Sequence, residues 1–363
     1  MNNYDWLKPR RRRRNLFIVE GNHEKNELMG LLLKIYPEID IKPEDIIIYT
    51  TNIYQLYKLI VDKYGDEWFD IDVDLPFIVG EKLKMRETLH KVDFMNILLI
   101  FDYERHDPFF SEEKINHLQQ YFHDSTDVGK LYINYPMVES YKHLFSIPDS
   151  GYAERSISVS LQPGDKYKNL VKDTDIAHLV NLPKKMKEIL SKRFMIQDQE
   201  KCTEYVEMIL LIRSDENDLS IQVREILNEA LDEQDLLTAQ FQMKALIERN
   251  RYAGLGKTYY EYMRDIFNEI IVHNIRKGKR IQSGKYDFPK CELKKCYEDI
   301  SFLDILDRQN ARSRDFETGM IWVINTSVLF IPDYNFNLIE VGEGEGVSEE
   351  GGAAPEGRDE ISQ

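Results

Sequence analysis

The sequence predicts an α/β protein with a mostly parallel sheet flanked by helices, followed by a mainly α-helical part. Short apolar runs recur between residues 15 and 150, and each precedes a segment with apolar residues at helical spacing. Beyond residue 151, helical spacing dominates almost to the end. We therefore predict a basic arm at 1–14, an α/β domain at 15–150, a helical domain at 151–339 and an acidic disordered tail at 340–363.

Continuous apolar runs, mostly β-prone, predict four buried strands in the first domain, at 16–19, 46–49, 95–101 and 130–134. Helical patterns follow them at 22–36, from Ile53 to a stop at Gly65, at 81–89, from an N-cap at Ser111, and in a short segment ending near Phe145. The second part predicts helices at 175–193, 200–213, 220–231, 235–249, 258–276 and 299–312. A strand at 156–161, a loop at 277–285, and strands or core segments at 320–324 and 328–331 complete the prediction.

The chain is acidic, with a net charge of −16. The tail from Glu340 onward holds eight acids and one base, a charge of −7, which leaves −9 for the rest. This acidity argues against a passive, charge-driven nucleic-acid binder, but it allows an enzyme that holds phosphates through metal ions and local cations. The run Arg10 to Arg14 is a candidate phosphate contact, with a solvated arm or a docking patch for an acidic partner as the alternative.

The sequence also bears on the compartment. No apolar run approaches the ~20 residues of a membrane-spanning helix, and no secretory signal is expected from the N-terminus. The 3 cysteines are too few for a disulfide framework. We therefore expect a cytoplasmic protein that does not use a membrane.

Acidic residues follow the predicted strands. Glu20 follows the first strand, with Glu24 one helical turn further on, and Asp102 and Glu104 follow the third. Glu139 follows the fourth. Because parallel strands share a direction, these side chains are expected to meet at one edge of the sheet, which is where α/β folds bind ligands.

Gathered carboxylates need compensation. Two of them ~4 Å apart repel by about 4 kcal/mol at an effective dielectric constant of ~20. A set of oxygen ligands favours Mg²⁺ or Mn²⁺, whereas a single acid at a strand end is usually an N-cap or an ion-pair partner. Lys130, Arg105 and His106 lie nearby in the sequence and are candidates for neutralising charge or moving a proton, with Lys130 included among the catalytic residues.

These residues resemble a known family. The run from Phe17 to Gly21 with Glu24, followed by the run from Ile100 to Glu104, is similar to the Toprim domain of topoisomerases, primases and OLD-family nucleases. The resemblance implies Mg²⁺-dependent phosphodiester chemistry. Glu20 would be the general base or a metal ligand, Asp102 and Glu104 metal ligands, and Glu24 a secondary ligand.

The resemblance extends to the fourth strand. Asn134, Pro136 and Glu139 are similar to an N-P-x-x-E element of the OLD-type and phage-defence branches, and Glu139 would be a further secondary ligand. The helical half loosely resembles that of PARIS-type and RloB-like defence effectors. One departure is the second motif, which is Asp-x-Glu rather than Asp-x-Asp, so the longer side chain of Glu104 shifts the metal geometry.

A second phosphate-binding pattern is discounted. The run from Gly254 to Thr258 imitates the end of a phosphate-binding loop, but Arg251 stands where the first glycine is required. We instead expect Thr258 to cap a helix. The chain is thus predicted to lack its own ATPase and to depend on a partner ATPase or sensor protein.

Together these features predict a metal-dependent nuclease that acts on DNA or on a structured RNA such as tRNA. The resemblance implies a toxic effector of bacterial antiviral defence, with the helical half as a docking or homodimerisation surface. Two alternatives remain open. One is a non-catalytic Toprim-like regulatory or binding module, and the other is a Mg²⁺-dependent nucleotide phosphohydrolase.

Overall fold

The computed structural model describes residues 14–161, 164–213, 219–250 and 252–339. The predicted acidic tail lies outside these ranges, as does the predicted basic arm except for Arg14. Arg14 begins the first strand and forms an ion pair with Asp45 at 3.4 Å. Within the described ranges, no helix combines the length and apolar composition that a membrane crossing requires.

The predicted mostly parallel sheet is confirmed. It contains β1 (Arg14–Val19), β2 (Ile46–Ile48), β3 (Phe94–Asp102), β4 (His123–Asp124) and β5 (Gly129–Asn134), in the order β2-β1-β3-β5-β4. All neighbours run parallel except β4 and β5. The central strands are almost fully buried, which explains why their sequences are apolar throughout.

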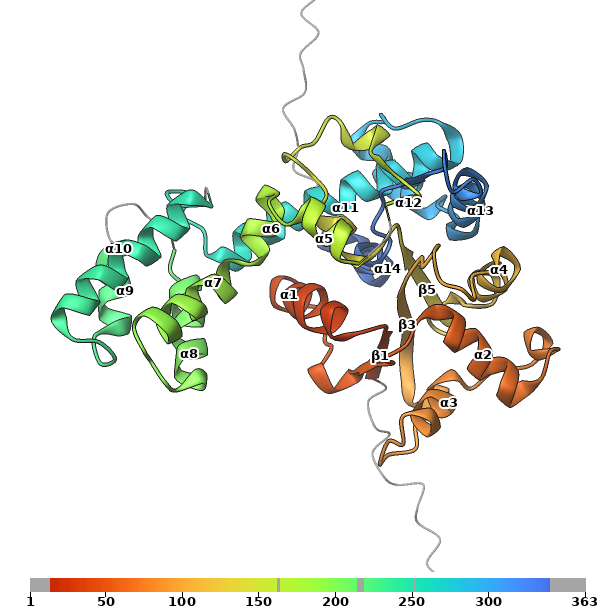
Figure 1. The fold of residues 1–363 in the computed structure, drawn as a ribbon, viewed down its shortest axis with the longest axis horizontal. Helices are drawn as coiled ribbons and strands as arrows, with labels where there is room; N and C mark the ends of the chain where they lie inside the picture. The colour runs from red at the N-terminus through yellow and green to blue at the C-terminus, as the bar shows by residue number, and fades with distance from the viewer. Residues whose placement is uncertain (1–13, 162–163, 214–218, 251, 340–363) are drawn as a thin grey trace, which may run out of the picture.

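Helices cover both faces of this sheet. In Figure 1, α1 (Gly30–Ile35) lies on one side, and α2 (Ile53–Tyr64), α3 (Leu75–Lys82) and α4 (Glu112–Tyr121) lie on the other. The first turns before α1 form a π-helix, Glu24–Met29. Short 3₁₀ segments occur at Pro43–Asp45, Trp68–Asp70, Lys91–Asp93, Val138–Lys142 and Tyr152–Glu154.

The remaining elements follow in chain order. They are β6 (Ser156–Ser158), α5 (Asp165–Val171), α6 (Asp175–Val180), α7 (Leu182–Glu188), a π-helix (Ile189–Arg193), α8 (Gln199–Leu210), α9 (Leu219–Leu227), α10 (Glu233–Arg249) and α11 (Tyr259–Ser283). A 3₁₀ turn (Lys290–Glu292), α12 (Leu293–Glu298), α13 (Phe302–Ser313), β7 (Met320–Trp322), a 3₁₀ turn (Ser327–Leu329), α14 (Phe330–Asn335) and a last 3₁₀ turn (Phe336–Leu338) complete the chain.

Local capping determines several helix ends as predicted. Ser111 accepts a hydrogen bond from the Lys114 amide, and Thr258 forms a reciprocal capping box with Glu261. Gly65 follows the end of α2 with φ 83°, a conformation that favours glycine. The Thr258 cap explains the glycine-rich run before it without a bound phosphate.

Two local predictions are wrong. The helix expected at 81–89 lies earlier, as α3, because Asp74 caps it and Pro76 fits its first turn. The loop expected at 277–285 is helical to Ser283, and Gly278, buried in α11, packs against Ile300. Of the two alternatives for 328–331, the structure shows a buried core segment, which is helical.

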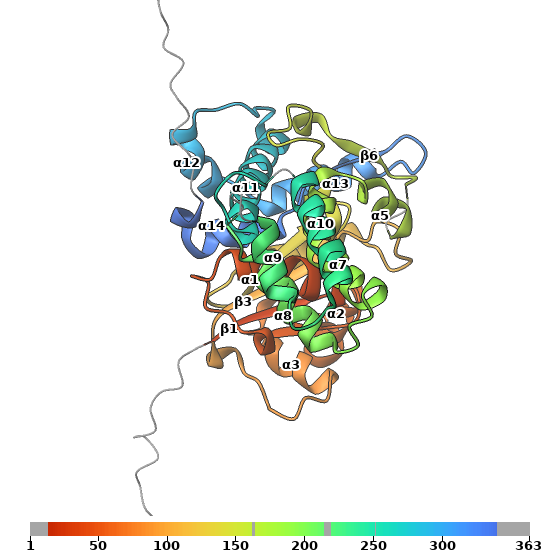
Figure 2. The ribbon, with the colours of Figure 1, turned by 90° about the vertical axis from the view of Figure 1, so that its left-hand side faces the viewer.

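The part after residue 150 is not one separate helical unit. Helices α7 to α10 (residues 182–249), here called the helical lobe, pack on one another and project from the sheet (Figure 1). Figure 2 looks onto this lobe, with the sheet behind it. The later elements return to the sheet: Phe330 packs edge-on against Phe17 at 5.1 Å, and Ile324 forms a β-bridge with Tyr135.

Helix α11 links these parts through its buried polar residues. The ammonium of Lys277, which is fully buried, donates to the carbonyl oxygens of Tyr152, Ala153 and Arg155 at 3.0, 2.7 and 2.9 Å. Burial, with repulsion from Arg312 and Arg155, lowers the pKa of Lys277 to about 7. These three bonds hold the chain between β5 and β6 against α11.

We expect Phe330→Ala to destabilise the whole protein by about 3–5 kcal/mol, because it opens a cavity against β1. The matched control is Phe241→Ala, since Phe241 is 58% exposed on α10 and should change stability by less than about 0.5 kcal/mol. Chemical denaturation followed by far-UV circular dichroism measures both variants. Equal effects of the two substitutions would contradict a core shared by α14 and the sheet.

Candidate functional site

The carboxyl ends of β1 and β3 bring the first two acids together. Val19 pairs with Ile100 in register, and the Glu20 amide continues the ladder to the Ile100 carbonyl at 3.2 Å. The Asp102 amide then donates to Glu20 Oε2 at 3.3 Å. The two acids predicted to meet at this edge are therefore neighbours in the structure.

Glu24 lies above the same edge, in the first turn of the π-helix. Its Oε2 accepts a hydrogen bond from the Gly21 amide at 2.7 Å, and the side chain is only 5% exposed. A Cβ at Gly21 would approach that oxygen to 3.2 Å, closer than ordinary van der Waals contact. Glycine at position 21 thus lets the Glu24 carboxylate fold back over the strand end.

Glu104 sits in an unusual backbone conformation. Its φ is 45°, in the left-handed region that non-glycine residues rarely adopt. The Glu104 carbonyl accepts a hydrogen bond from the Asp107 amide at 2.9 Å, which closes a turn after β3. Asp107 is held by the Asn52 side chain at 2.5 Å, so a further carboxylate lies beside Glu104.

Glu139 belongs to the same group but has two basic side chains beside it. It lies in the 3₁₀ segment after β5, with a side chain that is 2% exposed. His23 Nε2 is 2.7 Å from Glu139 Oε1, and Lys168 Nζ is 3.3 Å from it. Burial favours a raised pKa, but these two groups outweigh it and hold the pKa of Glu139 below its ordinary value.

Lys130 does not join these acids, which corrects its assignment as a catalytic residue. It lies at the beginning of β5 beside Leu98, whereas Asn134 at the other end of the strand pairs with Asp102. Its Nζ contacts Asp333 Oδ2 at 2.5 Å. Lys130 is close to these acids in the sequence but not in space. It begins a parallel strand, and the beginnings of parallel strands lie at the opposite edge of the sheet from their carboxyl ends.

Arg105 and His106 also form their contacts away from these acids. The Arg105 guanidinium lies over the rings of Phe110 and Phe316 at 4.1 and 4.6 Å, and its Nε donates to Ser313 Oγ at 3.1 Å. His106 Nε2 is bonded to the carbonyl of Val159. Both side chains fasten the loop after β3 to later segments rather than extend toward the carboxylates.

The strand-end acids perturb one another. Burial, reinforced by repulsion from Glu104 and Glu24, raises the pKa of Glu20 to about 8, although the Asp102 amide opposes the shift. Burial and repulsion from Glu20, Glu24 and Glu139 raise the pKa of Asp102 well above its usual range. In both cases the fold removes water from a carboxylate and places further negative charge beside it.

The other two acids shift in the same direction. Burial raises the pKa of Glu24, and repulsion from Glu139 adds to it, against the opposing hydrogen bonds from backbone amides. Burial and then Asp107 raise the pKa of Glu104. Apart from Glu139, the candidate ligands thus have raised pKa values, because too little positive charge lies near them. Perturbed pKa values of this kind are typical of functional sites.

The chemistry of these donors fits a hard divalent cation such as Mg²⁺ or Mn²⁺. All are carboxylate oxygens, and Asp102 Oδ1 is buried with no hydrogen-bond partner among the described residues. In the described ranges, however, no three Asp, Glu, His or Cys side chains are already placed to hold a metal ion. Binding one therefore requires carboxylate side chains to rotate toward it, with Glu20, Asp102 and Glu104 as ligands and Glu24 beside them.

Three functional candidates were not identified from the sequence. Asp107 follows Asp102 and Glu104 in the same acidic segment after β3, and this proximity in the sequence could have indicated its place in the site. His23 stands between Glu20 and Glu24 but has no motif of its own. Lys168 lies on α5, beyond the predicted domain boundary, and nothing in its local sequence indicates the contact with Glu139.

Comparison of the chain with protein-family models, with curated proteins and with solved structures finds no match. Any function must therefore be argued from the residues and their arrangement.

The raised pKa of Glu20 predicts a pH-dependent stability. Its ordinary pKa is 4.5 and its folded value is about 8, so between these values the folded protein retains a proton that the unfolded chain has released. Stability should therefore fall as pH rises from about 4.5 to 8. With a metal chelator present, we expect Glu20→Gln to flatten this fall and to raise the melting midpoint at pH 8 by about 1–3 °C.

Differential scanning fluorimetry across this pH range measures the effect. Glu67→Gln is the matched control, because Glu67 is exposed and far along the chain from the strand ends. A wild-type midpoint that falls toward pH 8 no more steeply than that of Glu20→Gln would contradict a proton-retaining glutamate at position 20.

Proposed function

We propose that this protein is a Toprim-type, divalent-metal-dependent nuclease that hydrolyses phosphodiester bonds at the acidic edge. One observation carries the proposal: Glu20 and Asp102 are adjacent at the ends of parallel strands, and Asp102 Oδ1 is buried without a hydrogen-bond partner among the described residues. Burying several carboxylates without a positive charge beside them costs free energy. A divalent cation that bridges the carboxylates and a phosphate would offset that cost. The resemblance of the flanking motifs to Toprim supports the same reading.

Different side chains at the acidic edge would have different roles in phosphodiester hydrolysis. A bound Mg²⁺ or Mn²⁺ would supply charge neutralisation for the phosphodiester. Asp102 and Glu104 would hold the ion. Glu20, which accepts a hydrogen bond from the Asp102 amide, would be the general base for an attacking water or a further ligand of the ion.

Lys168 is suited to the role first assigned to Lys130. Its side chain is 41% exposed beside Glu139, and the charges of Glu139, Asp102 and Glu24 raise its pKa. It is therefore a permanent cation within electrostatic range of the acids. We assign it the role of binding the phosphate, with Glu139 and His23 positioning it.

The biological role rests on the resemblance. We propose a cytoplasmic toxic effector of antiviral defence that acts on DNA or tRNA and is restrained or triggered by a partner ATPase or sensor protein. The helical lobe carries exposed apolar side chains suited to such a partner or to a second copy of the chain. These are Met208, Leu211, Ile221, Leu237 and Phe241.

A non-catalytic regulatory module is the second candidate. The observation that favours it is the separation of the acids, since no three ligands are preassembled within the described residues. A Mg²⁺-dependent nucleotide phosphohydrolase would use the same acids on a smaller substrate. Cleavage of polymers, of mononucleotides or of neither separates the three functions.

We expect Glu20→Gln and Asp102→Asn to lower cleavage of plasmid DNA or total tRNA about 100-fold or more, because each removes a charge at the reacting edge. Lys168→Ala should lower it about tenfold. Lys130→Ala is the control and should retain activity, since Lys130 begins β5 at the opposite edge. Gel assays with Mn²⁺ or Mg²⁺, with and without a candidate partner ATPase, give the rates.

Metal binding can be tested separately from turnover. Mg²⁺ or Mn²⁺ at 100-fold excess over its Kd should stabilise the wild type by about 2.7 kcal/mol, and Asp102→Asn should abolish that gain. Thermal denaturation with and without the ion measures it. Metal-independent stability with no cleavage of any substrate would favour the regulatory module, and turnover of mononucleotides alone would favour the phosphohydrolase.

A further inference from the structure

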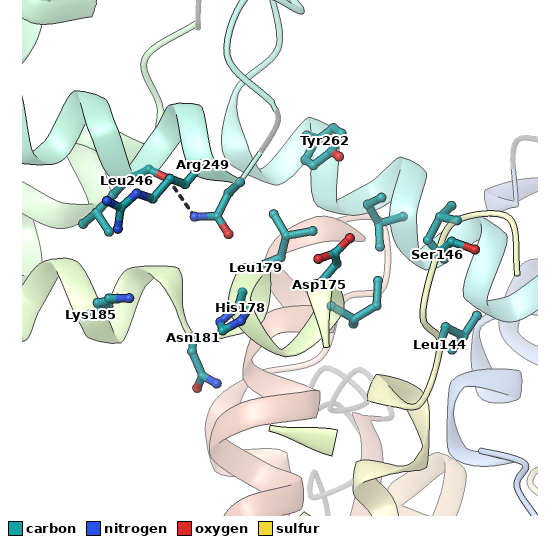
Figure 3. Close-up of a pocket in the computed structure, with 14 residues that line it drawn as sticks. Leu144, Ser146, Asp175, His178, Leu179, Asn181, Lys185, Leu246, Arg249 and Tyr262 are labelled. Atoms are coloured by element: carbon teal, nitrogen blue, oxygen red, sulfur yellow. Dashed lines mark hydrogen bonds between the residues drawn. The ribbon is translucent and has the colours of Figure 1, made fainter. Parts of the chain in front are cut away.

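A cavity of about 640 Å³ lies away from the acidic edge, where the helical lobe joins the rest of the fold. Its walls come from α6, α7, α10 and α11 and from the segment around residues 144–147 (Figure 3). Its volume falls within the range of about 300–1,000 Å³ that is usual for small-molecule sites. The cavity is thus large enough for an organic ligand rather than for a bare ion.

The cavity is polarised from end to end. Figure 3 shows Lys185 on α7 and Arg249 on α10 at one end, and Leu144 and Ser146 at the other. Apolar side chains form much of the remaining wall: Ile147, Ile176, Leu179, Leu246 and Ile266. A ligand that matches this gradient has an anionic group at one end and an uncharged body.

The two cations are both accessible to a ligand. Lys185 and Arg249 are exposed side chains, in a chain whose net charge is −16. They belong to different helices of the lobe that pack against each other. An ammonium and a guanidinium at one end of a cavity suit a doubly charged group such as a phosphate, which accepts hydrogen bonds from both.

The middle of the cavity offers groups that suit a sugar and a planar ring. Asp175 and Asn181 provide hydrogen-bonding oxygen atoms, and Tyr262 provides an aromatic ring. The Tyr262 ring is itself braced by stacking on Tyr252, with centroids 5.7 Å apart and an interplanar angle of 24°. A braced ring and an apolar wall favour a flat, rigid ligand body.

We propose that this cavity binds a nucleoside phosphate, with the phosphate between Lys185 and Arg249 and the base against the apolar wall. The ligand would touch the lobe through α7 and α10 and the rest of the fold through α11 and Leu144. Its occupancy would therefore stabilise one orientation of the lobe. This site is independent of the proposed nuclease function, because no lining residue belongs to the acidic edge.

Isothermal titration calorimetry on the full chain tests the site. The probes are AMP, GMP, CMP, UMP and ATP, with adenosine and inorganic phosphate as partial ligands, all in excess EDTA so that no metal–nucleotide complex forms. We expect at least one nucleotide to bind, and both adenosine and inorganic phosphate to bind at least about tenfold more weakly.

Matched variants locate the binding. Lys185→Ala and Arg249→Ala should each weaken nucleotide binding about tenfold, and both residues are exposed enough for the fold to tolerate the change. Lys184→Ala, an exposed neighbour on the same helix, should leave affinity unchanged. Glu20→Gln should also leave it unchanged, which separates this cavity from the acidic edge.

The proposal is overturned if no nucleotide binds the wild type, or if inorganic phosphate binds as tightly as any nucleotide. It is equally overturned if Lys185→Ala and Arg249→Ala bind like the wild type, or if Glu20→Gln alone abolishes binding. None of these results depends on whether the protein cleaves nucleic acid.

Discussion

The register between β1 and β3 is the constraint on which the site depends. Val19 lies beside Ile100, so Glu20, one residue further on β1, and Asp102, two residues further on β3, lie at the same edge of the sheet. A shift of one residue would turn their side chains to the opposite faces of the sheet and bury different groups. The apolar runs of both strands lock this register, since every side chain from Leu16 to Val19 is almost completely buried.

The carboxylates at this edge of the sheet differ in their electrostatic surroundings. Glu139 lies beside His23 and Lys168, which hold its pKa below the ordinary value despite burial. Glu20 and Asp102 have no basic partner among the described residues, and their pKa values are raised. In the function proposed here, a divalent cation would supply the positive charge beside these two acids.

Pattern and capping predicted much of the architecture because they act locally. The four apolar runs became strands, and Ser111 and Thr258 capped helices as expected, since each of these signals needs only its near neighbours. The errors have tertiary causes. Gly278 lies within a helix, where it packs closely against Ile300 from a later part of the chain.

The sequence by itself determined that acids follow the parallel strands, because a buried strand and the residue after it are recognised from residues adjacent in the sequence. Only the tertiary structure decided which charged groups meet them. Lys168 reaches Glu139 from a helix beyond the sheet, whereas Lys130, closer in sequence, faces the other edge and pairs with Asp333. Side-chain partners separated by long stretches of chain depend on how helices pack, and packing is a property of the whole fold rather than of any local pattern.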